Sequence, residues 1–206
     1  MFNIRKNLIN FFVISYSLIN LSHNNSQIAP RLNFKETEKY TAEQIVYSAS
    51  RINNLEKSLE YADSYAKSIK YESDSSNYGK KNYYASFKVI NQRRKDDCDG
   101  IAVAKMALLL KYDPKILIIS DNYYLTESHA EAIVIKDGKY YSPGISNNRG
   151  FDSMGELVNE IALILGEPKI KYKYFFICNF DKEDLVYSDE DIKKKRIIEE
   201  YGTIQN

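Results

Sequence analysis

The chain has 206 residues, with 29 Lys and Arg against 28 Asp and Glu, and 44% of its residues are hydrophobic. A net charge of +1 excludes the strongly basic domains typical of nucleic-acid-binding proteins. The mean hydropathy of −0.47 and the lack of an apolar run of ~18 residues exclude a polytopic membrane protein. Two Cys and two His are too few to favour a zinc site built from these residues alone.

The N-terminus has the pattern of an export signal. Arg5 and Lys6 precede a mostly apolar run over 8–21, and a positive segment followed by ~7–15 apolar residues is typical of a secretory signal peptide. Two asparagines dilute the run, so a buried first helix is the alternative. We expect a signal peptide at 1–22, a linker at 23–40 and an exported protein, periplasmic or secreted, with no stable membrane span.

The folded body is expected to begin with a helix. Thr41 and Gln44 have the spacing of a capping box, and the apolar residues behind them recur at helical intervals. This pattern predicts one helix over 41–70. Residues 71–82 are rich in Ser, Asn and Gly and are predicted to form a loop.

A second predicted helix begins around Cys98 and continues through an Ala- and Leu-rich run that ends before Pro114. After it the apolar period changes from that of a helix to that of strands. Further strands are predicted at 115–120, 129–135, 139–141 and 171–180, with a turn at Asp137-Gly138 and a helix at 154–165 capped by Asp152 or Ser153. The order predicts a single α+β domain over 41–185, expected to be a monomer, followed by a charged tail over 186–206.

Cys98 and His129 form the combination that carries chemistry. A helix N-terminus places free amides beside a thiol and favours its thiolate, and an imidazole can accept the thiol proton. Taken singly, Cys98 is best explained as a small buried residue and His129 as a structural histidine. Together, a Cys at a helix start and the one His in the predicted body point to nucleophilic catalysis.

The segments before and around Cys98 read Tyr71-x-x-Asp74, Tyr78-Gly79, Tyr83-Tyr84-Ala85-Ser86 and Asp97-Cys98-Asp99-Gly100-Ile101-Ala102-x-Ala104-Lys105. They resemble the pattern Y-x-x-D, YG, Y-W-A-[ST]-P, then G-D-C-[ED] of the bacterial transglutaminase-like cysteine proteinases. A strand that begins with His follows 31 residues after Cys98. The likeness covers approximately residues 45–145. It implies a papain-like fold with the Cys helix on an antiparallel sheet, a cysteine peptidase activity on a protein or peptide, and a periplasmic location; some members clip surface adhesins.

The chain departs from the family pattern at several positions. Asp96 stands where the family has Gly, and Tyr84 and Phe87 stand where it has Trp and Pro. The family's third catalytic residue, an Asp on the strand after His, has no counterpart. Its role as the orienter of the imidazole could fall to Ser142, Asn147 or Asn148, and of these we favour Asn147.

Asp97 and Asp99 flank Cys98, and in adhesin-clipping relatives such an acidic pair is associated with calcium. Two carboxylates cannot fill a site for ~6–8 oxygen ligands, so calcium is possible here but no cofactor is required. Asp99 could instead cap the helix. Gln92 could donate to an oxyanion, but an exposed polar residue is the favoured interpretation. Cys178 is expected to be a packed thiol, not a disulfide partner of Cys98.

Two functions remain open from the sequence. The first is a cysteine peptidase or amide hydrolase with a thioester intermediate, in which the Cys98 amide helps to hold the oxyanion. The second is a catalytically silent module that keeps the cleft but lacks a complete triad.

Overall fold

The computed structural model describes residues 39–80, 83–121, 128–167, 172, 174–178, 180–181 and 186–187. The expected signal peptide, the linker up to residue 38 and nearly all of the charged tail lie outside the described residues. Among the described helices, none is long and apolar enough to cross a membrane.

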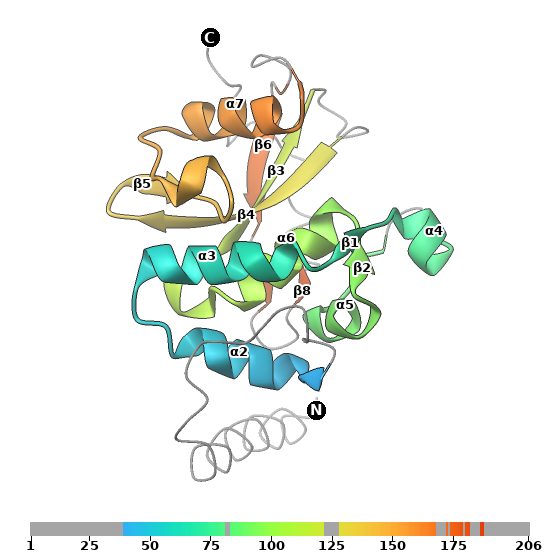
Figure 1. Ribbon diagram of the computed structural model, residues 1–206. Coiled ribbons are helices and arrows are strands. Elements are labelled where there is room, and N and C mark those ends of the chain that lie inside the picture. The colour runs from blue at the N-terminus through green and yellow to red at the C-terminus, as the bar shows by residue number, and fades with distance from the viewer. Residues whose placement is uncertain are drawn as a thin grey trace, which may run out of the picture.

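A four-stranded antiparallel sheet forms the centre of the molecule, in the order β5-β4-β3-β6 (Figure 1). The predicted strands are confirmed, with the bounds β3 Lys115–Ser120, β4 Ser128–Lys136, β5 Lys139–Tyr141 and β6 Tyr174–Cys178. The hairpin between β4 and β5 turns at Asp137 and Gly138, both with positive φ (51° and 74°). This is the conformation that an Asp-Gly hairpin turn requires.

Helices cover both faces of the sheet (Figure 1). The six described α-helices are α2 Ala42–Ser50, α3 Leu55–Ala66, α4 Asp74–Tyr78, α5 Phe87–Arg93, α6 Cys98–Ala107 and α7 Met154–Ile164. Residues of α2, α3, α5 and α6 share one buried cluster with Ile116 and Ala132 of the sheet, whereas α7 packs in a second cluster with Leu117 and Ile133. Neighbouring residues of a strand point to opposite faces, so the sheet separates two cores. The predicted α+β class, with the Cys98 helix packed on an antiparallel sheet, is confirmed.

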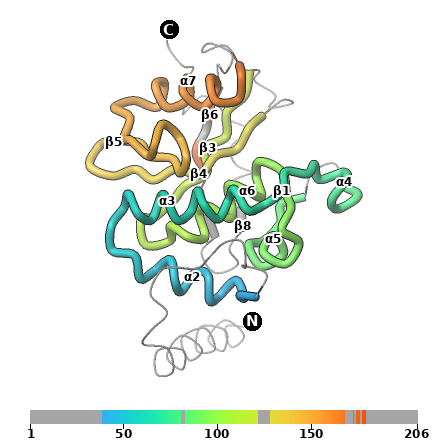
Figure 2. Tube along the Cα trace, viewed as in Figure 1, coloured from blue at the N-terminus to red at the C-terminus, as the bar shows by residue number. Residues whose placement is uncertain are grey.

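The prediction of one helix over 41–70 is wrong, because the chain folds there into α2 and α3 (Figure 2). The capping box at Thr41 and Gln44 is present as expected. The chain breaks after Ser50 and restarts at Asn54, whose side chain accepts a hydrogen bond from the Lys57 amide at 3.0 Å. Asn is a strong N-cap and a poor interior helix residue, so it starts a second helix at this point.

The prediction of a loop over 71–82 is also wrong in part, since α4 occupies its middle. The helix ends at Gly79, whose φ of 67° suits glycine. The Asp74 side chain accepts a hydrogen bond from the Tyr83 amide and so ties the two ends of this segment together. Ser- and Asn-rich composition hid the helix, because its stability comes from this tertiary contact and not from propensity.

A short parallel pairing brings the segment before α4 beside the segment that leads into α6. Strand β1 (Lys70–Tyr71) pairs with β2 (Lys95–Asp96), and Tyr71 lies opposite Asp96 in the register. The Glu72 amide donates to the Asp96 carbonyl at 2.9 Å. The pairing therefore places residues 71–74 against the start of the Cys98 helix. The remaining short elements are β7 Phe180–Asp181, β8 Val186–Tyr187 and the 3-10 helices Leu110–Tyr112 and Ser146–Asn148.

Candidate functional site

Cys98 is the first residue of α6. The cap before it is Asp97, whose side chain accepts a hydrogen bond from the Asp99 amide at 3.3 Å. The alternative role for Asp99, that of the helix cap, is therefore wrong. The Asp97 carbonyl accepts from the Ile101 amide at 3.0 Å. Cys98 therefore lies at the N-terminal end of a well-formed helix, where the amides are partly free and the dipole is positive.

The thiol of Cys98 lies against strand β4. The backbone amide of Ala130, the residue after His129, donates a hydrogen bond toward the sulfur. Lys105, seven residues and thus two turns further along α6, reaches Glu131 on the same strand. One face of α6 therefore runs along β4 from the region of His129 onward, with Cys98 at its start.

The edge of β4 is open to α6 at this point. In the described ladder, β5 pairs with β4 only at Val134–Lys136. Nearer the start of β4, the Ala130 amide donates a hydrogen bond to the Cys98 sulfur, and the Ala132 amide donates to Glu131 Oε1 at 3.0 Å. Amides two residues apart point the same way along a strand, so both are directed to the side from which α6 approaches.

Burial dominates the electrostatics of Cys98 and raises the pKa of its thiol to about 12. The amides of Ala130 and of Cys98 itself oppose this effect, while the carboxylates of Asp99 and Asp97 reinforce it. The sequence alone suggested the opposite direction, because a helix N-terminus favours a thiolate. In this structure Cys98 rests as a neutral thiol, and a nucleophilic role requires a base that accepts its proton.

His129 is the second residue of β4 and lies opposite Ile119 of β3 in the register. Its side chain is 21% exposed, and its Nε2 lies 4.0 Å from Glu131 Oε2. His129 and Glu131 are two residues apart on one strand, so their side chains share a face. The carboxylate that contacts His129 among the described residues is therefore Glu131, which the sequence analysis did not single out.

Glu131 forms a buried ion pair with Lys105, at 2.6 Å between Oε1 and Nζ. Both residues are buried, with 6% and 8% exposure. Burial alone would raise the pKa of Glu131, but the charge of Lys105 and the contact with His129 outweigh it and lower the pKa to about 2. Glu131 is thus fully ionised. One sequence feature could have pointed to this pair: Lys105 lies within the largely apolar run of α6, and Glu131 lies within the largely apolar run of β4.

Four aspartates gather around the start of α6. Asp74, Asp96 and Asp97 offer ligand atoms that lie within 4.8 Å of one another, and so do Asp97, Cys98 and Asp99. Burial and the neighbouring carboxylates raise the pKa of Asp99 well above its ordinary range. Burial also raises the pKa values of Asp74 and Asp96. More carboxyl groups are concentrated here than the two aspartates flanking Cys98 suggested.

Two oxygens of this acidic cluster have no hydrogen-bond partner among the described residues. They are Oδ1 of Asp74 and Oδ2 of Asp99, and both are buried. A buried carboxylate oxygen without a donor is costly, and a bound cation would satisfy it. Carboxylate oxygens at this spacing suit Ca²⁺. The residue types present therefore fit a calcium ion, with Asp74 and Asp96 added to the two residues expected from the sequence.

Two exposed tyrosines border the same region. Tyr71 is 66% exposed and Tyr84 is 42% exposed. Burial of part of each ring raises the two pKa values. The neighbouring groups that add to this effect are Cys98, Asp97, Asp99 and Asp74 for Tyr71, and Asp99, Cys178, Asp74 and Asp97 for Tyr84. The hydroxyl groups thus lie in the electrostatic field of the candidate site, with their rings accessible from outside.

The candidates for the third catalytic residue lie around the 3-10 helix Ser146–Asn148. Asn147 is exposed, and Asn148 Oδ1 accepts from the Gly144 amide at 2.8 Å. Ser142 is fully buried, and its hydroxyl has no hydrogen-bond partner in the described part of the chain. Gly144 lies against Asp63 of α3. Within the described ranges no hydrogen bond joins His129 to any of these three candidates, so the role of Asn147 stays a prediction.

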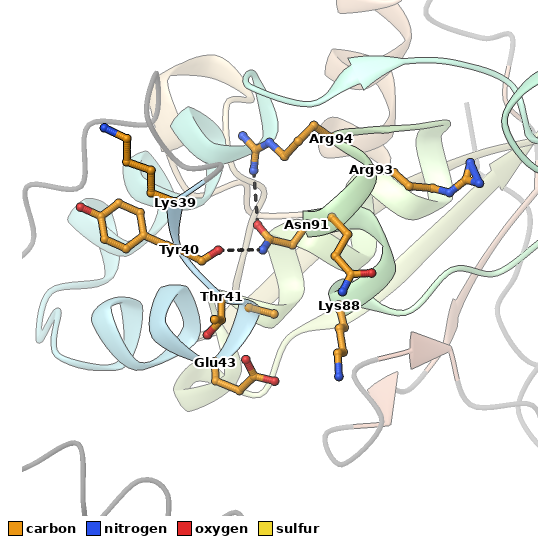
Figure 3. A pocket seen from close by; sticks show the side chains of 10 residues that line it. Lys39, Tyr40, Thr41, Glu43, Lys88, Asn91, Arg93 and Arg94 are labelled. Atoms are coloured by element: carbon orange, nitrogen blue, oxygen red, sulfur yellow. Dashed lines mark hydrogen bonds between the residues drawn. The ribbon is translucent and has the colours of Figure 1, made fainter.

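A cavity of about 670 Å³ lies elsewhere, between the start of α2 and α5 (Figure 3). Gln92 is exposed and lines it, as expected for a surface residue, whereas Cys98 and His129 do not. Asn91 donates to the Tyr40 carbonyl and accepts from Arg94 across the wall of the cavity. Its shape is thus held by polar side chains that already bind one another.

Cys178 lies in β6 and is buried, with 1% exposure. Neither it nor Cys98 forms a disulfide. The expectation of a packed thiol at Cys178 is confirmed, and no disulfide blocks the sulfur of Cys98.

Comparisons with known proteins give information about the fold alone. No protein-family model and no curated protein matches the chain. Among solved structures it is similar to LapG of Legionella pneumophila, at 15% identity and a TM-score of 0.43, over 73% of this chain and 85% of that chain. It is also similar to EGTA-treated LapG of Legionella pneumophila, at 14% identity and a TM-score of 0.46, over 84% of this chain and 99% of that chain. The crystal structure of a TGase matches at 16% identity and a TM-score of 0.35, over 69% of this chain and 41% of that chain. Identities this low say nothing of activity.

Proposed function

We propose that this chain is a cysteine peptidase or amide hydrolase of transglutaminase-like type, with Cys98 as nucleophile and His129 as general base and acid. One observation carries the proposal: the Cys98 thiol, at the start of α6, receives a hydrogen bond from the amide of the residue next to His129. A thiol at a helix N-terminus beside an imidazole on a strand is the arrangement that activates cysteine for attack on a carbonyl.

The reaction would proceed in two halves. His129 accepts the proton of Cys98, and the sulfur forms a bond to the substrate carbonyl carbon. The C–N bond then breaks, and the amine leaves with the proton from the imidazolium, which yields a thioester. In the second half water attacks the thioester, again with proton transfer to His129, and the acid product and the free thiol are released. An amine in place of water would give acyl transfer with the same residues.

Oxyanion stabilisation would come from the start of α6. The backbone amide of Cys98 points toward its own sulfur and is one of the contacts that lower the thiol pKa. An N–H group in this position can donate to the oxygen that becomes negative in the tetrahedral intermediate. The helix dipole adds to this effect.

The substrate class that fits the surroundings is an extended peptide or protein segment. Tyr71 and Tyr84 expose their rings beside the acidic cluster. Exposed aromatic rings with a polar end are typical of surfaces that bind peptides. The acidic residues favour a substrate with cationic side chains near the scissile bond, unless a cation occupies the cluster.

Calcium is the cation that the donor set fits. Asp97 and Asp99, with Asp74 and Asp96 beside them, would hold it through carboxylate oxygens. Its charge would offset the repulsion among these residues and reduce the acidic field that raises the Cys98 pKa. The proposed role of the ion is structural and electrostatic.

Covalent labelling tests the proposal. A thiol-directed probe such as iodoacetamide should modify Cys98 near neutral pH, and the site of modification is read by mass spectrometry. Cys98→Ala should remove this label, whereas Cys178→Ala should keep it because Cys178 is buried. Equal labelling of the Cys98→Ala variant and the parent would overturn the proposal.

A catalytically silent binding module is the second candidate, and the neutral resting state of Cys98 favours it. The pKa of about 12 leaves little thiolate at neutral pH unless His129 accepts the proton. In an enzyme, His129→Ala should slow the alkylation of Cys98 strongly. Slow alkylation that is the same with and without His129 would favour the binding module.

The proposed location is outside the cytoplasm, in the periplasm or secreted. It rests on the apolar run over 8–21 behind Arg5 and Lys6. N-terminal sequencing of the protein isolated from its own host tests it, since a processed chain should begin near residues 22–26 and an unprocessed one at Met1.

A further inference from the structure

The buried pair Lys105–Glu131 is unexplained by the fold alone. A buried ion pair is weak evidence for stability, because the loss of hydration of both charges offsets their attraction. An apolar pair of similar volume would serve the core equally well. Yet the two residues make a contact of 2.6 Å between α6 and β4, beside the proposed catalytic residues.

Glu131 divides its two oxygens between different partners. Oε1 accepts from Lys105 Nζ at 2.6 Å and from the Ala132 amide at 3.0 Å. Oε2 faces Nε2 of His129 at 4.0 Å. The two donors on Oε1 fix the plane and the rotation of the carboxylate, and so they aim Oε2 at the imidazole.

We propose that Glu131, held by Lys105, is the positioning residue of His129 in place of the aspartate that relatives carry on the next strand. Glu131 Oε2 receives the Nε2–H group, which leaves Nδ1 without a proton and able to accept one from Cys98. This inference rests on the proposed function, and it assigns the role for which the sequence suggested Asn147. Catalytic hydrogen bonds are often long in free enzymes and shorten in the substrate complex, which accounts for the 4.0 Å separation.

The charge of the pair suits this role. Lys105 and His129 keep the pKa of Glu131 low against the effect of burial, so the carboxylate acts only as an acceptor. An ionised acceptor at Nε2 selects one tautomer of the imidazole and stabilises the imidazolium that forms when Cys98 loses its proton.

Glu131→Gln is the decisive variant, because it keeps the shape and exchanges one oxygen for a donor. Lys105 and the Ala132 amide both require an acceptor, so the amide oxygen should occupy the place of Oε1. The NH₂ group then faces Nε2 of His129 and makes that nitrogen the acceptor. The imidazole proton should move from Nε2 to Nδ1, where it blocks the transfer from Cys98.

The tautomer is read directly by ¹⁵N NMR of the histidine-labelled full chain, at a pH where the imidazoles are neutral. The chain has only two histidines, so a His23→Gln variant assigns the His129 signals. We expect Nε2–H in the parent and Nδ1–H in Glu131→Gln. Alkylation of Cys98 should be slowed about 10- to 100-fold, the size of effect found for residues that orient a metal-ligating histidine. An unchanged tautomer in Glu131→Gln, or Nδ1–H in the parent, overturns the inference.

Control variants separate this role from a structural one. Asp152→Asn alters a pair of the same 2.6 Å length, with Lys139, and should leave both readouts unchanged. Should Glu131→Gln fail to fold, the apolar pair Lys105→Met with Glu131→Leu replaces it, and the Nε2 proton should then lose its protection from exchange with water. A protected Nε2–H in that variant also overturns the inference.

The two proposals fail separately. Labelling of Cys98 that depends on His129 but not on Glu131 would leave the hydrolase in place and remove the positioning role. If the His129 tautomer changes in Glu131→Gln but Cys98 labelling does not depend on His129, the positioning role of Glu131 stands and the hydrolase proposal is removed.

Discussion

Gly100 lies directly against the side chain of Asp96. A Cβ atom on Gly100 would lie 2.6 Å from the Cβ of Asp96 and closer still to its carboxyl carbon. Asp96 is completely buried, and its carboxylate accepts from the Tyr78 hydroxyl at 2.6 Å and from the Asp97 amide at 3.0 Å. Because these contacts fix Asp96, only glycine fits two residues after Cys98, and the start of α6 can approach β2 closely.

We therefore expect Gly100→Ala to destabilise the protein by about 1–3 kcal/mol, as overpacking of a buried site does. Ala is the better helix former by ~1 kcal/mol, so the variant would be stabilising if there were no clash. Urea denaturation followed by circular dichroism measures the difference. In an Asp96→Ala background the same substitution should cost less; an equal cost in both backgrounds would refute the steric explanation.

The pH dependence of Cys98 alkylation should change form without His129. Below the pKa of a thiol, its thiolate fraction and alkylation rate rise about tenfold per pH unit. Burial holds the Cys98 pKa at about 12, so in His129→Ala the rate should keep rising well past ~8.5, where an ordinary thiol levels off. Iodoacetamide kinetics over a pH series measures this. A plateau near the ordinary thiol value in His129→Ala would contradict the effect of burial.

The acidic cluster should make the protein less stable as the pH rises toward neutrality. The pKa values of Asp74, Asp96 and Asp99 are raised in the folded state. Groups of this kind stabilise the fold below their unfolded pKa of ~3.9 and lose that contribution as the pH rises through the folded value. Glu131 acts in the other direction, because its lowered pKa contributes stability above its ordinary pKa that is lost as the pH falls from there to about 2.

Asp99→Asn tests this sign. The amide is neutral at every pH, whereas Asp99 must keep in the folded state a proton that the unfolded chain has already lost. The variant should therefore be more stable than the parent near neutral pH and should lose less stability between mildly acidic and neutral conditions. Thermal midpoints across a pH series measure both effects. Parallel pH profiles for the variant and the parent would show that Asp99 does not contribute to the slope.

Calcium should raise the thermal midpoint of the parent, because a ligand that binds only the folded state stabilises it by about 2.7 kcal/mol at 100 times its Kd. Asp97→Asn should abolish the shift, since Asp97 belongs to both groups of candidate ligands. Asp152→Asn, an exposed aspartate paired with Lys139, is the matched control and should keep it. A shift that survives in Asp97→Asn would exclude this cluster as the site.

The sequence by itself determined those features that depend on neighbouring residues. The capping box at Thr41, the helix start at Cys98, the strands β3 and β4 and the Asp137-Gly138 turn follow from local hydrogen bonding, apolar period and backbone sterics. Local pattern also misled. The apolar spacing over 41–70 continues through the break before Asn54, because periodicity does not record where a cap interrupts a helix.

Only the tertiary structure decided which charged groups meet at the site and how their pKa values are shifted. Lys105 and Glu131 are 26 residues apart, and Asp74 and Asp96 meet through the pairing of β1 with β2. Their proximity depends on chain crossings that no local pattern encodes. The pKa of Cys98 likewise depends on how much water the packed sheet and helices exclude and on which charges they bring near. Residue types and spacing therefore named the proposed nucleophile and base, Cys98 and His129, whereas desolvation and long-range contacts decide the pKa of Cys98 and the partners of both residues.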